Sequence, residues 1–113
     1  MLLSAGIDFN KVISTKPVSK DETFVVHATQ NNKDKCRLGI SVPKTKIKNA
    51  TERNKLKRVI RHTLSDLEFK PMDIVLVYRG TAKKYDAKLV SSSLGFHKDN
   101  IVNLTEHNWK TSE

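Results

Sequence analysis

The feature that most constrains this 113-residue chain is one segment that carries most of its positive charge. Residues 44–62 contain eight basic side chains and one acid, a net charge of +7, whereas the whole chain holds +9 and residues 95–113 sum to −1. The basic residues are Lys44, Lys46, Lys48, Arg53, Lys55, Lys57, Arg58 and Arg61. Because the charge is concentrated in one place instead of spread for solubility, it predicts a surface that binds a negatively charged partner.

The same segment has the pattern of an ordered amphipathic helix. Asn49 can cap its start, and Glu52 stands three residues on, as in a variant of the capping box. An apolar stripe at helical spacing follows, made of Leu56, Val59, Ile60, Leu64 and Leu67. At about 100° per residue, the opposite side holds Asn54, Lys55, Arg58, Arg61 and His62, with Arg53 and Lys57 on the flanks. We therefore expect a helix between Asn49 and Leu67 with one face in the core and a cationic face in water.

A short helix and two strands are predicted upstream. Asp8 opens a helix with Phe9, Val12 and Ile13 on one face, and Lys16–Pro17 ends it. Residues 22–29 alternate as a strand, with His27 on the opposite side from the apolar set Phe24, Val26 and Ala28. A polar turn at 30–34 leads into a strand at 37–42, which places Leu38, Ile40 and Val42 inward and Gly39 and Ser41 outward.

Downstream, residues 73–79 (DIVLVYR) are nearly all apolar, which is typical of a central strand buried on both faces. A last helix is expected from about Tyr85 to Leu94, with Leu89, Val90 and Leu94 facing inward. Residues 95–113 then predict a polar C-terminal extension, whose sizeable apolar anchors are Ile101, Leu104 and Trp109.

This order, α-β-β-α-β-α, predicts a single small α/β sandwich of the α+β class over residues 1–94. The 37% of hydrophobic residues suffices for one core. Cys36 alone cannot form a disulfide framework, and the four histidines have no zinc-site spacing. No apolar run reaches the ~20 residues of a membrane helix, and Asp8 comes too early for a signal peptide. We expect a soluble intracellular protein, with a right-handed crossover in its β-α-β unit by default.

Taken in order, these elements resemble the protein subunit of bacterial ribonuclease P. That family has a strand of the type RLGxSV, then lysines, then a helix of the type N-A-x-x-R-N-R-x-K-R-x-x-R. Here the strand is RLGISV and the helix reads Asn49, Ala50, Arg53, Asn54, Lys55, Lys57, Arg58 and Arg61. The resemblance covers about residues 8–94 and includes the DIVLVYR strand. Lys55 replaces an arginine, Lys48 stands where a glycine is usual, and Thr45 is an extra loop residue.

The resemblance implies a function in trans. In that family the catalyst is the RNA subunit with bound Mg²⁺, while the protein binds this RNA and the 5′ leader of precursor tRNA. It also implies a left-handed crossover in place of the default, a cytoplasmic location, and a monomeric protein within a 1:1 ribonucleoprotein. The RNA-binding candidates are Lys44, Lys46, Lys48, Arg53, Asn54, Lys55, Lys57, Arg58 and Arg61. The leader-binding candidates are Phe9, Ile13 and His27; the family usually has aromatics at the last two, so stacking would be weaker here.

The chemistry of these residue types agrees with that reading. Arginine can fork onto two phosphate oxygens, which lysine cannot, and A-form RNA is recognised through its backbone and 2′-hydroxyls. Several alternatives stay open. The helix face can be a merely solvated one, Phe9 and Ile13 can be core residues, and His27 can be an ordinary strand histidine. The function can instead be that of a non-catalytic RNA-binding structural protein, such as a ribosomal or assembly factor.

No catalytic residue is expected on the protein itself. The acids Asp66, Glu68 and Asp73 surround a helix end, where a solvated surface is favoured over a two-metal site. Cys36 has no triad partner and is expected to be a buried or edge thiol. Tyr78 is expected to pack in its strand.

Overall fold

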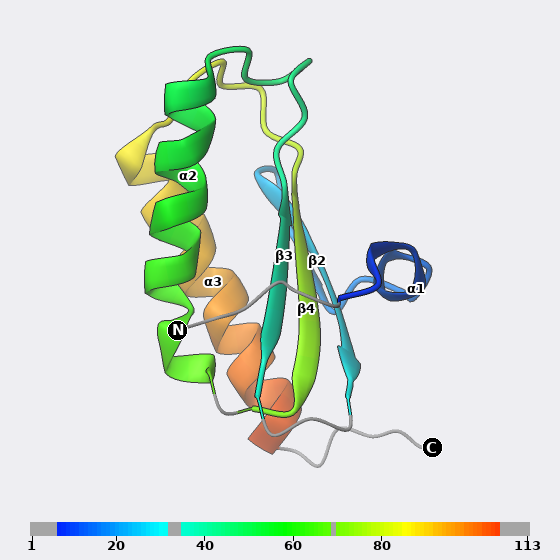
Figure 1. Cartoon of the computed structure of the whole chain (residues 1–113). Coiled ribbons are helices and arrows are strands. Elements are labelled where there is room, and N and C mark those ends of the chain that lie inside the picture. The colour runs from blue at the N-terminus through cyan, green and yellow to red at the C-terminus, as the bar shows by residue number, and fades with distance from the viewer. Residues whose placement is uncertain (1–6, 32–34, 69, 107–113) are drawn as a thin grey trace.

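The computed structural model describes residues 7–31, 35–68 and 70–106, and its frame is one four-stranded mixed sheet with helices on both faces (Figure 1). The strands are β1 (Ser19–Lys20), β2 (Phe24–Gln30), β3 (Arg37–Ser41) and β4 (Met72–Tyr78), in the spatial order β1-β2-β4-β3. The helices are α1 (Phe9–Ile13), α2 (Ala50–Thr63), the 3-10 turn η1 (Ser65–Leu67) and α3 (Ala87–Glu106). Helix α1 covers one face of the sheet, and α2 and α3 cover the other. This is the predicted α+β sandwich with one unpredicted strand, β1.

The central strand is β4, as its apolar run predicts. It pairs antiparallel with β2 and parallel with β3, so that β3, α2 and β4 form the expected β-α-β unit. Alternation then sorts its side chains: Ile74, Leu76 and Tyr78 point toward α2 and α3, while Asp73 and Val75 point toward α1. All five are buried. Because both faces of β4 are covered, the sheet separates two different surfaces of the molecule.

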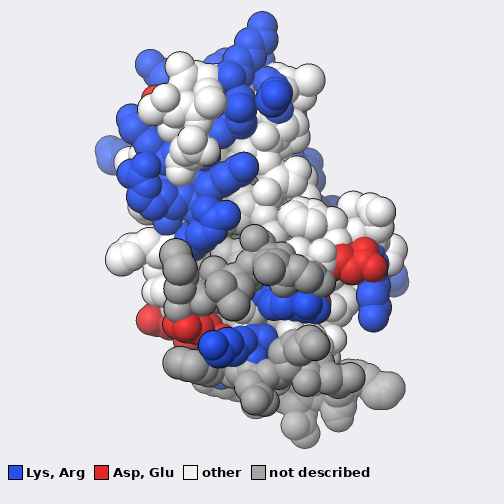
Figure 2. All heavy atoms as spheres, in the orientation of Figure 1, with Lys and Arg blue, Asp and Glu red and all other residues white. Residues whose placement is uncertain are grey.

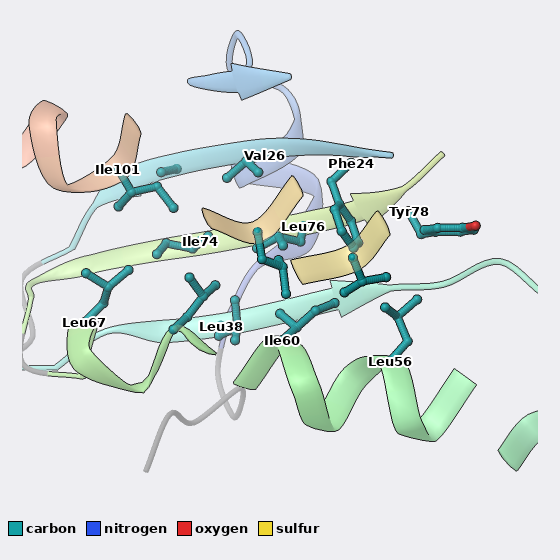
Figure 3. Close-up of a cluster of buried hydrophobic side chains, with 14 of the residues drawn as sticks. Phe24, Val26, Leu38, Leu56, Ile60, Leu67, Ile74, Leu76, Tyr78 and Ile101 are labelled. Atoms are coloured by element: carbon teal, nitrogen blue, oxygen red, sulfur yellow. The ribbon is translucent and has the colours of Figure 1, made fainter. Parts of the chain in front are cut away.

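The main core lies between the sheet and the two long helices (Figure 3). Leu56 and Ile60 on α2, with Leu64 and Leu67 just after it, are at most 1% exposed, and Val59 is half-buried. They pack with Phe24, Val26, Leu38, Ile74 and Leu76 from the sheet. Helix α2 ends at Thr63. The following turn η1 places Leu67 in the same core as the apolar stripe of α2. The predicted inward face is therefore confirmed.

The predicted end of the last helix at Leu94 is wrong. Helix α3 continues to Glu106, and Ile101 is fully buried in the core. Gly95 lies on the exposed side of the helix with open space where a Cβ would stand, so it costs the helix only its propensity, about 1 kcal/mol. Leu89, expected to face inward, is 42% exposed. Residues 107–113, with Trp109, lie outside the described residues.

The buried side of α3 contains two polar residues, which interrupt the apolar spacing from which the length of a helix is predicted. Ser93 and His97 are buried between Val90, Leu94 and Ile101. The Nδ1 atom of His97 is hydrogen-bonded to Ser19 Oγ on β1, and its Nε2 lies 3.0 Å from Asp21 Oδ1. Ser93 Oγ donates to the other oxygen of Asp21 at 2.7 Å. These contacts dock α3 on the β1–β2 connection.

Candidate nucleic-acid interface

The cationic side of α2 is the first candidate surface. Asn49 caps the helix by accepting a hydrogen bond from Glu52 N at 3.1 Å, as predicted. The side chains expected on the solvent side are all exposed: Asn54, Lys55, Arg58, Arg61 and His62. The flanking residues Arg53 and Lys57 are half-buried, also as expected. In Figure 2 the lysine and arginine atoms gather along this helix. The helix therefore offers a rigid row of positive charge.

Arg53 differs from the other cations because its guanidinium is used inside the protein. Its Nη1 donates to the carbonyl oxygens of Ile47 at 2.9 Å and of Lys48 at 2.7 Å. Ile47 is fully buried, and the amides of Lys46 and Ile47 both donate to Pro43 O. The β3–α2 loop is thus fastened to the first turn of α2. Sequence reasoning placed Arg53 among the phosphate contacts and missed this function.

The fastened loop carries three further predicted residues. Lys44 and Lys48 are exposed and Lys46 is half-buried. Blocks of like charge are often disordered, but here a turn, a buried anchor and the two Arg53 hydrogen bonds order the block. The lysines therefore present their charge beside α2 without a large ordering cost on binding. We call the exposed side of α2 together with these lysines the α2 surface.

The second candidate surface lies on the other face of the sheet, around α1. Asp8 caps α1 by accepting from Lys11 N at 3.1 Å. Only Val12 is buried; Phe9 is 37% exposed and Ile13 41%, so the core-packing alternative does not describe them. The five-residue helix thus shows apolar side chains to solvent.

The sheet beneath α1 explains its position. His27, Val75 and Gly39 lie opposite one another on β2, β4 and β3, and so form one row on the α1 face. The ring of Phe9 rests on Gly39, where a Cβ would come within 2.4 Å of Phe9 Cζ. At the other end of the row, His27 Nδ1 is hydrogen-bonded to Thr15 O at 2.9 Å. Gly39, predicted to face outward, is therefore covered by the Phe9 ring, which packs against the glycine because no Cβ is present.

The three leader-binding candidates are brought to this one face. Phe9 lies over β3 and half-buried His27 lies on β2, with Ile13 between them in the chain. The next row of the same face, Val25, Val77 and Ser41, is half-exposed. We call the exposed parts of these residues the α1 surface. It is apolar and aromatic, in contrast to the cationic α2 surface behind the sheet.

Two of the acids that follow α2 in the sequence, Asp66 and Asp73, form ion pairs with basic side chains. Asp73 on β4 accepts hydrogen bonds from Arg37 Nε at 2.8 Å and Arg37 Nη2 at 2.7 Å, and Asn31 Nδ2 also donates to it at 2.7 Å. Burial alone would raise the pKa of Asp73, but these hydrogen bonds lower it on balance. Asp66 pairs with Lys98 at 2.7 Å. Across residues 7–31, 35–68 and 70–106, no three His, Cys, Asp or Glu side chains are grouped as metal ligands.

The other singled-out side chains have structural positions. Cys36 is buried, and burial raises the pKa of its thiol to about 12, so the thiol is unreactive. Tyr78 is buried at its ring and donates its hydroxyl to Ala82 O at 2.8 Å. Both predictions are confirmed. Within the described part of the chain, no helix combines the length and apolar character that crossing a membrane requires.

A small mixed sheet with a preorganised cationic helix on one face defines a class: compact basic proteins that bind nucleic acid. Comparison with known proteins gives the family. The ribonuclease P family model matches residues 2–100. Ribonuclease P protein components from Mesoplasma florum and Staphylococcus haemolyticus are each 35% identical to the chain. The alignments cover 69% of this chain and 74% of the first relative, and 81% and 82% for the second.

Solved structures agree. The RNase P protein of Staphylococcus aureus matches with a TM-score of 0.71 at 31% identity, over 88% of this chain and 93% of that one. The protein from Thermotoga maritima matches with a TM-score of 0.59 at 28% identity, over 92% and 94%. The chain belongs to the bacterial ribonuclease P protein family. It is a protein component of an endoribonuclease complex that matures tRNA, and ribonuclease P RNA is its partner.

Proposed function

We propose that the α2 surface binds the ribonuclease P RNA, while the α1 surface holds the 5′ leader of precursor tRNA. In this proposal the RNA subunit, with its Mg²⁺ ions, carries the chemistry of 5′ cleavage, and the protein acts as a monomer in a 1:1 cytoplasmic ribonucleoprotein. The observation that carries the proposal is the separation of the two surfaces by the sheet. One is cationic and suits a phosphate backbone, and the other is apolar and suits unstacked bases.

Electrostatics supports the first assignment. Arg58 and Arg61 are exposed and have no acid partner within the described residues, so their guanidinium forks are available to phosphate oxygens. Lys55 approaches Glu52 only at 3.5 Å and is 48% exposed, a pairing worth little in water. Asn54, which precedes Lys55 on the exposed side of α2, supplies both donor and acceptor groups for a ribose hydroxyl or a base edge.

Shape supports the second assignment. A single strand that crosses α1 would pass Phe9, whose ring is supported from below by Gly39. Ile13 can only make apolar contact, whereas His27 can stack or accept a hydrogen bond at Nε2 of its neutral ring, because its Nδ1–H donates to Thr15 O. The leader contact is therefore expected to depend mainly on one aromatic ring.

The engagement of Asp73 by Arg37 and of Asp66 by Lys98 supports a protein without catalytic side chains. Its contribution is positioning and charge neutralisation, which lower the Mg²⁺ concentration that the RNA needs.

Reconstitution tests the proposal. The protein is mixed with a bacterial ribonuclease P RNA and a precursor tRNA at low Mg²⁺, and 5′ cleavage and substrate affinity are measured with and without protein. We expect the protein to speed 5′ cleavage. We also expect it to raise the affinity for the leader-bearing precursor more than the affinity for mature tRNA. If the protein binds the RNA but changes neither quantity, the alternative of a purely structural RNA-binding protein is correct.

A further inference from the structure

A second group of basic side chains lies outside the predicted site, in the connection between β4 and α3 and in the first turn of α3. Residues 79–88 contain four basic residues and one acid, Asp86, a net charge of +3. The four are Arg79, Lys83, Lys84 and Lys88, and all are exposed. The single acid is occupied, because its Oδ1 accepts Leu89 N at 3.1 Å and so caps α3. The connection is thus strongly cationic.

The fold brings this connection beside the β3–α2 loop. Because β3 and β4 are parallel neighbours, the chain leaves both strands at the same end of the sheet, and both loops lie there in Figure 1. A hydrogen bond joins the connection to the first turn of α2: Tyr85 N donates to Glu52 Oε1 at 2.9 Å. Glu52 therefore does not complete a capping box with Asn49 but ties the second cationic loop to the α2 surface. Figure 2 shows lysine and arginine atoms along α2 and over this end.

The connection is also ordered. Arg79 N donates to Thr23 O at 2.8 Å, and the Tyr78 hydroxyl donates to Ala82 O at 2.8 Å. Gly80 is buried against the Tyr78 side chain, where a Cβ would come within 2.8 Å of the ring carbon Cζ. With the Tyr85 bond, these contacts hold the loop at both ends. The charges are therefore presented on a preorganised support, which lowers the entropy cost of binding.

The charges do not stabilise the fold. Within the described residues none of the four basic side chains forms an ion pair. Lys83, Lys84 and Lys88 flank the N-terminal turn of α3, where the helix dipole favours anions and disfavours cations. Unpaired like charges in an unfavourable position are expected to act on something outside the chain.

We propose that Arg79, Lys83, Lys84 and Lys88 bind backbone phosphates of the ribonuclease P RNA and extend the α2 surface across the end of the sheet. This inference rests on the proposed function and adds a binding site to it. The ligand is a phosphodiester backbone, so the contacts are electrostatic and independent of base identity.

The test compares two double variants of the full chain that remove equal charge. In the first, Lys83→Gln and Lys84→Gln neutralise the proposed site. In the control, Lys35→Gln and Lys70→Gln neutralise an exposed lysine just before β3 and a half-buried lysine just before β4, at the opposite end of the sheet. Glutamine keeps much of the side-chain stem, so packing is preserved. The affinity for ribonuclease P RNA is measured as a function of salt, with thermal unfolding as a check of folding.

We expect the first variant to reduce the magnitude of the slope of log K against log salt by about 1.4–1.8, which is two contacts at about 0.7–0.9 each. Taken over the roughly tenfold difference between about 1 M and about 0.1 M salt, this change weakens binding about 25–60-fold near 0.1 M salt. The control is expected to leave the slope unchanged. Arg79→Gln alone should lower it by about 0.7–0.9. Equal slopes in both double variants would overturn the inference. An effect confined to precursor tRNA, with the affinity for ribonuclease P RNA unchanged, would overturn it as well.

The failure of this inference is distinguishable from that of the proposed function. If the unaltered protein promotes 5′ cleavage but the two double variants behave alike, only the second cationic site is wrong. If the unaltered protein gives no salt-dependent binding to ribonuclease P RNA, the proposed function fails first.

Discussion

Replacing Arg53 is expected to distinguish the contribution of the α2 arginines to the stability of the fold from their contribution to RNA binding. Among the arginines of α2, Arg53 is half-buried and donates to two backbone carbonyls, whereas Arg58 is exposed. Arg53→Ala removes both hydrogen bonds and frees the β3–α2 loop. Arg58→Ala removes the same formal charge and no side-chain hydrogen bond or ion pair within the described residues. The pair is therefore matched in charge and different in structure.

The magnitude follows from the two bonds. A hydrogen bond that involves a charged group contributes about 1.5–3 kcal/mol. The Lys48 carbonyl is exposed, so water replaces that partner, while the bond to Ile47 is partly buried. We expect Arg53→Ala to lower the free energy of unfolding by about 1–2 kcal/mol. Arg58→Ala is expected to stay within about 0.5 kcal/mol of the parent, as surface substitutions usually do.

Urea unfolding followed by circular dichroism measures the first quantity, and salt titration of RNA binding measures the second. Arg58→Ala is expected to lower the salt slope by about 0.7–0.9. Arg53→Lys retains the charge but cannot present the same fork, so we expect a nearly unchanged slope and an affinity about 2- to 5-fold lower, because the loop must be ordered on binding. If Arg53→Ala and Arg58→Ala lose equal stability, the loop-fastening function of Arg53 is refuted.

Three further predictions concern the sheet and the opposite face. Gly39→Ala places a Cβ against the Phe9 ring and is expected to weaken binding of leader-bearing precursor while affinity for ribonuclease P RNA is unchanged; equal losses would contradict it. His27→Ala is expected to reduce affinity for precursor tRNA more than for mature tRNA, and an equal effect on both would remove His27 from the α1 surface. Burial raises the pKa of Asp21, but donated hydrogen bonds outweigh it and lower the pKa from 3.8 to about 2. Its stabilisation is therefore present above about pH 4 and lost as the pH falls toward 2, an effect of about 1 kcal/mol after solvent screening; Asp21→Asn should flatten this acid limb of a melting-temperature profile.

The α2 surface was predictable because all of its information is local. A cap, an apolar stripe and the charges between its members determine which side chains face water, and each lies where expected. The central position of β4 was also predictable, because only a strand covered on both faces carries such a continuous apolar run. Both inferences needed nothing beyond the spacing of residues along one element.

The rest depends on partners distant in the sequence. The length of α3 depends on His97 and Ser93, whose contacts at Ser19 and Asp21 lie 78 and 72 residues away. Strand β1 has two residues and exists only because it pairs with β2. The bond between Tyr85 and Glu52 spans 33 residues. No periodic pattern records such contacts, so the sequence could indicate neither the extent of α3 nor the position of the second cationic loop beside α2.

The layer order explains how one small chain can contact two RNAs in the proposed function. The side chains of β4 alternate between a core shared with α2 and α3 and a row that supports α1, so a single buried strand positions both surfaces. Because the two surfaces lie on opposite faces, a strand bound at Phe9 does not compete for the cations of α2. Their substitutions are far enough apart that their effects on affinity should add. In the proposed function, the charge of the α2 surface therefore binds the large RNA on one side of the sheet, and the apolar α1 surface binds the leader by stacking on the other.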